Sequence, residues 1–338
     1  MDGRDKPGHD DVAALGEIMK RYAAALLAIF FAALVPSAHA QQYPAQDIHV
    51  ICAYPAGSGA DIFVRWYAER LRTVSGRTII VENKPGAISN VATEYVARAK
   101  PDGYTIYIQG ASSIGANMHL FKNPPVDVGK AIAIAAPLNK QPYMLVVDAR
   151  QPWKTVAELT AAMKEKGDKA SFATTNPPAK VMAAIYKHTA QLKAVEVPYR
   201  TAFDTVNDMM SGALDFSTYD PVFASQQAAA GKMRILAVST GQRTQANPDI
   251  PTMTESGIPT DLLGWFAAMV PAGTPRPVID QINKWFNEIN STDEAKKFLN
   301  SIGGDPWVTT PGEGQARFLK DIRDWGDYVR TANIEPQG

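Results

Sequence analysis

The sequence predicts an α/β protein built from two lobes with a cleft between them. Strand-like and helix-like segments alternate along most of the chain, which is the order of α/β folds. They form two successive series, and two amphipathic stripes near the C-terminus need an apolar surface to cover. If those stripes pack on the first lobe, the chain leaves that lobe near residue 140 and returns near 265. Two such crossings would form a hinge beside a ligand cleft.

The first series carries strand-like segments at 48–54, 78–83 and 105–110. Helices are expected over 60–74 and 89–99, the first because its apolar residues share one face at helical spacing. This repeated strand–helix order predicts a mostly parallel sheet covered by helices.

The second series begins after residue 142. Its strand-like segments are 143–147, 170–174, 194–197, 214–218 and 234–239, and helices are expected from 156 and over 179–190, 203–211 and 222–230. A polar, proline-rich connection leads to an apolar segment at 265–270, and the helical stripes follow at 278–289 and 318–329. We therefore expect a discontinuous first lobe, 41–141 with 264–338, and a second lobe, 142–263.

The N-terminal segment has the pattern of a secretory signal peptide. Lys20 and Arg21 precede an apolar run from Tyr22 to Val35, and Ala38 and Ala40 stand in the A-x-A arrangement of a cleavage site. The run is shorter than the roughly 20 residues of a membrane span, although an uncleaved anchor is the alternative. Residues 1–18 are charged and do not fit a signal peptide, so either Met19 is the true start or they are an upstream extension. A mature, exported protein would begin at Gln41.

Composition excludes several classes of function. The 338 residues carry 34 basic and 34 acidic side chains, so nothing indicates a polyanionic partner such as nucleic acid. Cys52 is the one cysteine, and we expect it to be a buried, unpaired thiol. None of the five histidines stands in an H-x-x-x-H pair. No metal site and no cofactor are expected.

The stretch "PAGSGAD", residues 55–61, follows the first strand and precedes a helix. Free backbone N–H groups and the positive end of the helix dipole favour an anion at such a position. Gly57 and Gly59 would let the backbone approach a ligand closely. The stretch is neither a dinucleotide fingerprint, because Ile62 stands where a third glycine is needed, nor a P-loop. The alternative is a tight turn that binds nothing.

Several segments together resemble the Bug family, the extracytoplasmic binding proteins of tripartite tricarboxylate transporters. They span nearly the whole mature chain in the family's order: "YPAQDIHVICAYPAGSGADIFVRWYAERL", "IIVENKPGA", "VARAKPDGYTIYIQG", "VPYR", "GKMRILAVST", "PDIPTMTESG" and "VPAGTP". The resemblance implies two lobes of the periplasmic binding-protein type (type II-like). It further implies a monomer in the periplasm that closes on a small carboxylated metabolite and delivers it to membrane permease subunits.

The resemblance also implies a ligand site made of three loops and a few neighbouring residues. The expected residues are Tyr54, Ala56, Gly57, Ser58 and Asp61 from the first loop, Gly110, Ser112 and Ser113 from the second, Thr174, Thr175, Asn176 and Lys180 from the third, and Arg200, Asp220 and Trp265. Pro177 and Pro178 replace the small residues usual in the third loop, which leaves the identity of the ligand open.

Alternatives stand beside four of these positions. Lys180 would meet a second carboxylate if it faces the cleft, or else is a solvated residue at a helix start. Asp220 would bind an amino group or a water, or else caps the helix that begins at Pro221. Trp265 would line the cleft or belong to the hinge core. Arg200 matches a position that is usually basic, but Thr201 replaces the family's next glycine.

Two other classes of function remain as alternatives. An orphan or sensor-coupled receptor would have the same sequence features. A hydrolase would need an activated serine with a His–acid pair, but Ser112 and Ser113 do not stand in a G-x-S-x-G motif.

Overall fold

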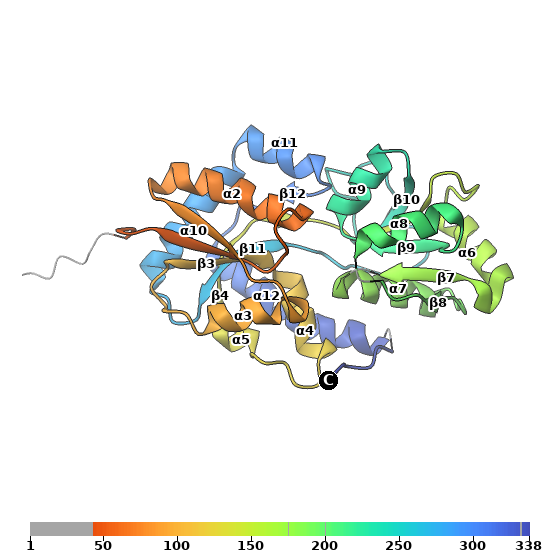
Figure 1. Cartoon of the computed structure of the whole chain (residues 1–338), viewed down its shortest axis with the longest axis horizontal. Coiled ribbons are helices and arrows are strands. Elements are labelled where there is room, and N and C mark those ends of the chain that lie inside the picture. The colour runs from red at the N-terminus through yellow and green to blue at the C-terminus, as the bar shows by residue number, and fades with distance from the viewer. Residues whose placement is uncertain (1–42, 175, 200, 332) are drawn as a thin grey trace, which may run out of the picture. The chain divides into compact units, whose positions relative to one another are not determined.

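The computed structural model describes residues 43–174, 176–199, 201–331 and 333–338, with the side chain of Pro177 left out. The predicted signal peptide lies outside these residues. The fold described below is that of residues 46–338 (Figure 1). No helix among the described residues is long and apolar enough to cross a membrane.

The first sheet has the strand order β2-β1-β3-β11-β4. Its strands are β1 (Ile48–Cys52), β2 (Ile79–Asn83), β3 (Thr105–Gly110), β4 (Ile132–Pro137) and β11 (Phe266–Pro271). Strand β1 pairs in parallel with β2 and β3, whereas β11 is antiparallel to both β3 and β4. The helices that accompany this sheet are α2 (Gly59–Ser75), α3 (Asn90–Ala97), α4 (Ala111–Leu120), α5 (Val128–Ala131), α10 (Arg276–Asn290), α11 (Asp293–Ser301) and α12 (Pro311–Thr331).

The second sheet has the order β10-β6-β9-β7-β8. Its strands are β6 (Met144–Asp148), β7 (Ser171–Thr174), β8 (Val195–Glu196), β9 (Phe216–Tyr219) and β10 (Met233–Val238). Its helices are α6 (Val156–Lys166), α7 (Pro177–Thr189), α8 (Ala202–Ser211) and α9 (Pro221–Ala229). A short pair, β5 (Asn139–Lys140) with β12 (Asp305–Pro306), and two 3-10 turns, η1 (Ala87–Ser89) and η2 (Gly167–Lys169), complete the described elements.

The prediction of a mostly parallel first sheet is wrong for the strand at the crossing, and the second sheet has an antiparallel strand at the same place. Strand β11 enters the first sheet where β3 ends, since Phe266 pairs with Gly110, and so it must run the opposite way. Strand β6 likewise starts beside the ends of β9 and β10, where Met144 pairs with Tyr219 and Val238. A chain that crosses between two sheets enters each sheet at the edge where its neighbours finish, which makes the entering strand antiparallel.

The sequence analysis gave no bounds for α4 and did not predict β4. Helix α4 has the sequence "ASSIGANMHL", in which small residues hide the helical stripe, and β4 has the alanine-rich sequence "IAIAAP". Both elements are held by α12, which contacts α4 and β4. Their identity therefore depends on packing rather than on local pattern.

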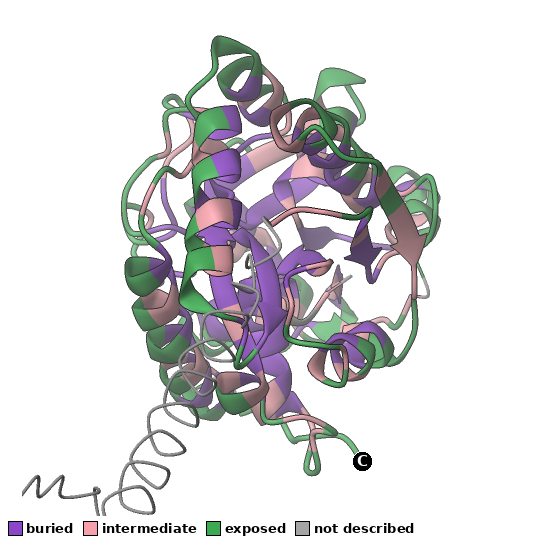
Figure 2. Ribbon diagram, turned by 90° about the vertical axis from the view of Figure 1, so that its left-hand side faces the viewer, coloured by how far each residue is buried: buried purple, intermediate pink, exposed green. Residues whose placement is uncertain are grey.

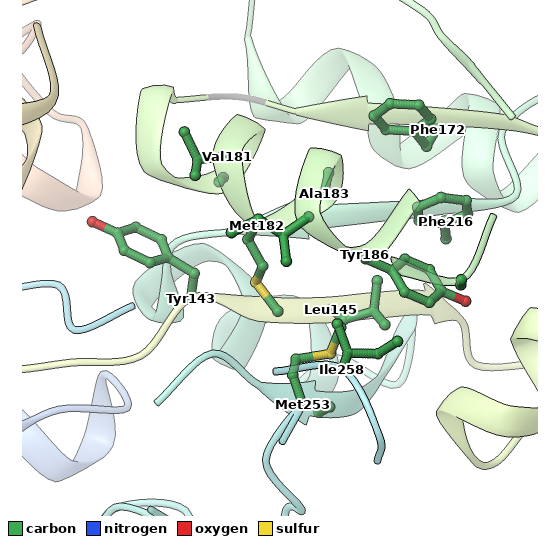
Figure 3. Close-up of a cluster of buried hydrophobic side chains, with 14 of the residues drawn as sticks. Tyr143, Leu145, Phe172, Val181, Met182, Ala183, Tyr186, Phe216, Met253 and Ile258 are labelled. Atoms are coloured by element: carbon green, nitrogen blue, oxygen red, sulfur yellow. The ribbon is translucent and has the colours of Figure 1, made fainter. Parts of the chain in front are cut away.

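Both sheets and the inner faces of the helices form the buried core, and the outer faces of the helices remain exposed (Figure 2). One cluster centres on the second sheet, where Met182 on α7 points toward Leu145 on β6 (Figure 3). The same cluster includes Ala116 on α4 and Trp325 on α12. The helices of the first sheet thus share a core with the second sheet on this side of the molecule.

Cys52 is buried and unpaired at the end of β1. Burial raises the pKa of its thiol to about 11, so the group stays protonated at neutral pH. This confirms the expectation of a small apolar side chain in the first strand.

A buried polar network joins α2 to α10 and to the segment between β4 and β5. The Tyr67 hydroxyl donates to Asn290 Oδ1 at 2.7 Å, and Asn290 Nδ2 donates to the Leu138 carbonyl at 2.9 Å. Both side chains are almost completely buried. Each bond is therefore made where water cannot replace it.

We predict that Tyr67→Phe lowers the free energy of unfolding by about 1–3 kcal/mol, because it removes the hydroxyl donor of a buried amide oxygen. Chemical denaturation checks this. Tyr95→Phe is the control, since Tyr95 is exposed on α3 and should change stability by less than about 0.5 kcal/mol. Equal stability of the two variants would contradict the importance of this network.

Candidate functional site

A cavity of about 580 Å³ lies between the two sheets. The strands whose ends approach it are β1 and β3 of the first sheet and β9 of the second, and α/β proteins commonly bind ligands beyond such carboxyl ends. The lining residues are Tyr54–Ala60, Phe63, Gly110, Ser112, Ser113, Gln141, Tyr143, Asn176, Thr201–Phe203, Asp220, Val222, Phe223, Gln226, Trp265 and Phe266.

Two larger hollows lie elsewhere and are more open to solvent. One, of about 1320 Å³, lies beside β1, β3 and α3, and the other, of about 830 Å³, lies beside α7 and β8. Neither has the convergence of strand ends and helix starts described next. The cavity between the sheets is therefore our candidate site.

Five helices begin at this cavity. Their N-cap residues are Ser58 for α2, Gly110 for α4, Asn176 for α7, Thr201 for α8 and Asp220 for α9, and all five line it. The first turn of a helix leaves backbone N–H groups without intrahelical acceptors, and the helix dipole makes that end positive. The cavity therefore combines positive partial charges from five directions.

The loop before α2 has a defined shape. Gly57 has a φ of 81°, which a side chain with a Cβ rarely adopts, and its N–H donates to Asp61 Oδ2 at 2.8 Å. No hydrogen bond to a protein acceptor is found for the N–H groups of Gly59 and Ala60 among the described residues. These two groups are therefore available to an acceptor in the cavity.

Asp61 holds this loop in place from beneath. Its carboxylate accepts from Arg65 Nε at 2.9 Å, from Asn83 Nδ2 at 2.7 Å and from the Gly57 amide. Burial raises the pKa of Asp61, but the hydrogen bonds from Arg65, Asn83 and Gly57 outweigh it, so the pKa lies below its ordinary value. The carboxylate is consequently ionised at neutral pH and fully occupied by protein donors.

Aromatic rings form much of the cavity wall. Phe266 lies 4.5 Å from Phe63 and 6.0 Å from Tyr54, measured between ring centroids. Phe203 meets Phe223 edge to face at 5.2 Å on the side of the second sheet. A ligand here would place an apolar body between rings and its charged ends near the helix starts.

The floor of the cavity belongs to the crossing segments. The Tyr143 hydroxyl lies 3.2 Å from Ser112 Oγ, and Trp265 Nε1 donates to Asp321 Oδ2 at 2.6 Å. Trp265 is fully buried in the core of the first sheet, and the residue also borders the cavity.

The residues that line this cavity include no lysine or arginine within the described ranges, and Asp220 is the one carboxylate among them. Asp220 Oδ1 accepts from the Phe223 amide at 3.0 Å, as an N-cap does. Burial raises the pKa of Asp220 despite this hydrogen bond. No group of metal-binding side chains is found in the described part of the chain.

The sequence matches the family model described as tripartite tricarboxylate transporter family receptor over residues 63–333. The chain belongs to this family. A UPF0065 protein of Bordetella bronchiseptica is 31% identical over 317 residues, which cover 92% of this chain and 93% of that protein. The resemblance to the Bug family and the two-lobe α/β fold that it implied are confirmed.

Solved structures agree with this family's fold. The periplasmic binding protein BugD is 26% identical, with a TM-score of 0.77, covering 87% of this chain and 100% of its own. R. palustris Rpa4515, solved with adipate, is 23% identical with a TM-score of 0.80 over the same shares of the two chains. Both structures share the fold of this chain over most of its length.

The cavity of this family member brings together most of the residues expected from the sequence. Those that line it are Tyr54, Ala56, Gly57, Ser58, Gly110, Ser112, Ser113, Asn176, Asp220 and Trp265. Thr175 and Arg200 lie outside the described residues.

Three expected residues do not line the cavity. Asp61 faces its own loop, as described above. Thr174 Oγ1 donates to Glu196 Oε1 at 2.6 Å, and Lys180 Nζ lies 3.2 Å from Glu196 Oε2. Glu196 on β8 therefore draws both side chains toward the hollow beside α7 and β8, so Lys180 does not offer its charge to a ligand in this cavity.

Several lining residues were missed. They are Phe63, Gln141, Tyr143, Thr201, Ala202, Phe203, Val222, Phe223, Gln226 and Phe266. Most are apolar residues whose spacing resembles that of any core residue. Thr201 had a usable signal, since Thr201 followed three residues later by Asp204 forms a capping box at the start of α8.

We predict that Asp61→Ala weakens ligand binding at least tenfold, because the Gly57 turn loses its anchor, and lowers the free energy of unfolding by about 3 kcal/mol. Asp148→Ala is the matched control. Asp148 is similarly buried and accepts from the Arg150 backbone and guanidinium, but it lies away from the cavity. It should lose similar stability and keep full affinity in calorimetry.

The contribution of Asp61 also depends on pH in a defined direction. Because its folded pKa is lowered from 3.8, the stabilisation is fully present above that value and is lost as the pH falls through the lowered pKa. Asp61→Asn should remove this dependence. An unchanged acid unfolding profile in Asp61→Asn would contradict the assignment.

Proposed function

We propose that this protein captures a small carboxylated metabolite outside the cytoplasm for uptake by a tripartite tricarboxylate-type transporter. The observation that carries the proposal is the convergence of five helix N-termini on one aromatic-walled cavity with no described lysine or arginine in its lining. Such a site stabilises a carboxylate by hydrogen bonds from backbone N–H groups rather than by an ion pair.

The proposed binding mode places the carboxylate at the start of α2. Gly59 and Ala60 would donate from the backbone, and Ser112 and Ser113 would contact the ligand from the start of α4. Asn176 and Thr201 would approach from the second sheet. Rpa4515 was solved with adipate, and the shared fold supports a carboxylate for this chain as well.

Closure of two lobes would complete the site. We place the first lobe at 41–141 with 264–338 and the second at 142–263. A Cβ on Gly59 would come within 3.0 Å of Val222 Cγ1, so the first turns of α2 and α9 already meet across the cavity in this structure. This close approach supports a closed arrangement, in which a ligand would be largely enclosed.

Export and partners follow from the same proposal. The signal-peptide pattern would direct the chain to the periplasm, and the mature monomer would deliver its ligand to the permease subunits. A role as an orphan or sensor-coupled receptor would use the same binding step. The protein would act without catalysis, since a receptor of this family releases its ligand unchanged.

We predict that isothermal titration calorimetry against mono-, di- and tricarboxylates will find at least one ligand, and that it is recovered unchanged. Loss of one charge-assisted backbone hydrogen bond of roughly 1.5–3 kcal/mol should weaken binding about tenfold to a hundredfold. Gly57→Val is unsuitable as a test, because its positive φ would distort the loop whatever the ligand does. Formation of a product from the bound compound would overturn the proposal.

We further predict that the exported protein begins at Gln41. Mass spectrometry of the periplasmic fraction checks this, with the N-terminal glutamine either free or cyclised. Recovery of a chain that retains Tyr22–Ala40 in the membrane fraction would show instead that the segment is an uncleaved anchor.

A further inference from the structure

The buried aspartates outside the cavity all have a cationic partner. Within the described residues, Asp61 pairs with Arg65, Asp148 with Arg150, Asp215 with Lys166 and Asp321 with Arg317. Burying a carboxylate without a partner is costly, so this pattern is the expected one. It provides an internal standard against which any other enclosed aspartate can be compared.

Asp220 departs from this standard. It forms no ion pair with any described residue, although it stands in the wall of an enclosed cavity. One of its oxygens, Oδ1, accepts from the Phe223 amide. No hydrogen bond to the described protein is found for Oδ2, which leaves a carboxylate oxygen for a partner in the cavity.

Asp220 lines the same cavity as Tyr54 and Tyr143. After burial, it is among the causes that raise the pKa values of the Tyr54 and Tyr143 hydroxyls, and both tyrosines line the same space. The start of α9, which Asp220 caps, lies against the start of α2 through Val222 and Gly59. A ligand carboxylate at α2 would thus lie in the same enclosed space as the Asp220 carboxylate.

Two carboxylates in one enclosed cavity repel each other unless a positive charge lies near one of them. The described lining supplies no such side chain. A ligand that carries its own cation satisfies both ends of the site at once. Its carboxylate would accept from the helix starts, and its cation would meet Asp220.

We propose that Asp220 selects zwitterionic ligands, in which an ammonium group pairs with the Asp220 carboxylate while the ligand carboxylate occupies the start of α2. Because aromatic rings form much of the cavity wall, we expect the part of the ligand between its ammonium and its carboxylate to be apolar. This inference rests on the proposed function, because it specifies which carboxylated compounds the same site takes.

The competing assignment is a protonated Asp220 that donates a hydrogen bond to the second carboxylate of a dicarboxylate. Burial raises the pKa of Asp220 and so favours the protonated form, whereas the N-cap bond from Phe223 favours the ionised form that an ammonium partner would need. The two assignments differ in measurable ways. A dicarboxylate held by a protonated Asp220 takes up a proton on binding and loses affinity as the pH rises, whereas a zwitterion does neither at neutral pH.

The test uses pairs of ligands that differ only in the amino group: leucine with 4-methylpentanoate, phenylalanine with 3-phenylpropanoate, 4-aminobutanoate with butanoate, and glutamate with glutarate. Calorimetry at pH 7 should show at least one amino compound bound ten or more times tighter than its deaminated partner. Asp220→Asn keeps the helix cap and the side-chain volume and removes the charge. In this variant the preference should fall at least tenfold, while the deaminated compound binds equally or more tightly.

Asp249→Asn, an exposed charge removal outside the cavity, should leave both affinities unchanged. Thermal melting of Asp220→Asn verifies that it folds. A preference for the deaminated partners, or an Asp220→Asn variant with an unaltered preference, would overturn the role of Asp220 but leave carboxylate binding intact. If glutarate binding takes up a proton and this uptake disappears in Asp220→Asn, Asp220 binds the ligand in its protonated form, and the ammonium pairing is wrong. If no carboxylate of either kind binds, the proposed function fails, and this inference fails with it.

Discussion

Every helix begins with backbone N–H groups that its own turns cannot satisfy, and this constraint organises the candidate site. In this protein the starts of α2, α4, α7, α8 and α9 face one cavity. Side-chain caps satisfy part of the need, as Ser58 does for the Asp61 amide and Asn176 for the Ala179 amide. The N–H groups that remain without a cap, together with the positive ends of the helix dipoles, can stabilise an anion although no cationic side chain is described in the lining.

The crossing segments decide where those helix starts meet. Strand β11 is joined to the first turn of α4 by the Ala111 amide, which donates to the Trp265 carbonyl at 2.9 Å. The Trp265 indole is tied to Asp321 on α12, and Arg317 on the same helix also binds Asp321. A buried carboxylate with two such partners resists rearrangement, so this contact fixes the first sheet's side of the cavity relative to the crossing.

The ion pairs that charged side chains form decide which of them contribute charge to the cavity. Lys180 pairs with Glu196 at 3.2 Å and borders another hollow, so its charge is not directed into the candidate site. Asp220 caps α9 and also lines the cavity, where it forms no ion pair with a described residue. The net effect is a site with backbone donors on one side and a lone carboxylate on another.

Local pattern alone determined the first strand, the loop at 55–61, helix α2 and most of the second series, because alternating and helical periodicity are written in consecutive residues. It also determined the family, through segments spread over the mature chain. Helix α4 and strand β4 needed tertiary structure, since their small residues acquire a buried face only when α12 packs on them. The antiparallel direction of β6 and β11, the positions of Lys180 and Asp61, and the ring-lined wall from Phe203 and Phe266 were likewise decided only in three dimensions. Each depends on which distant residue lies opposite, and that information is absent from local spacing.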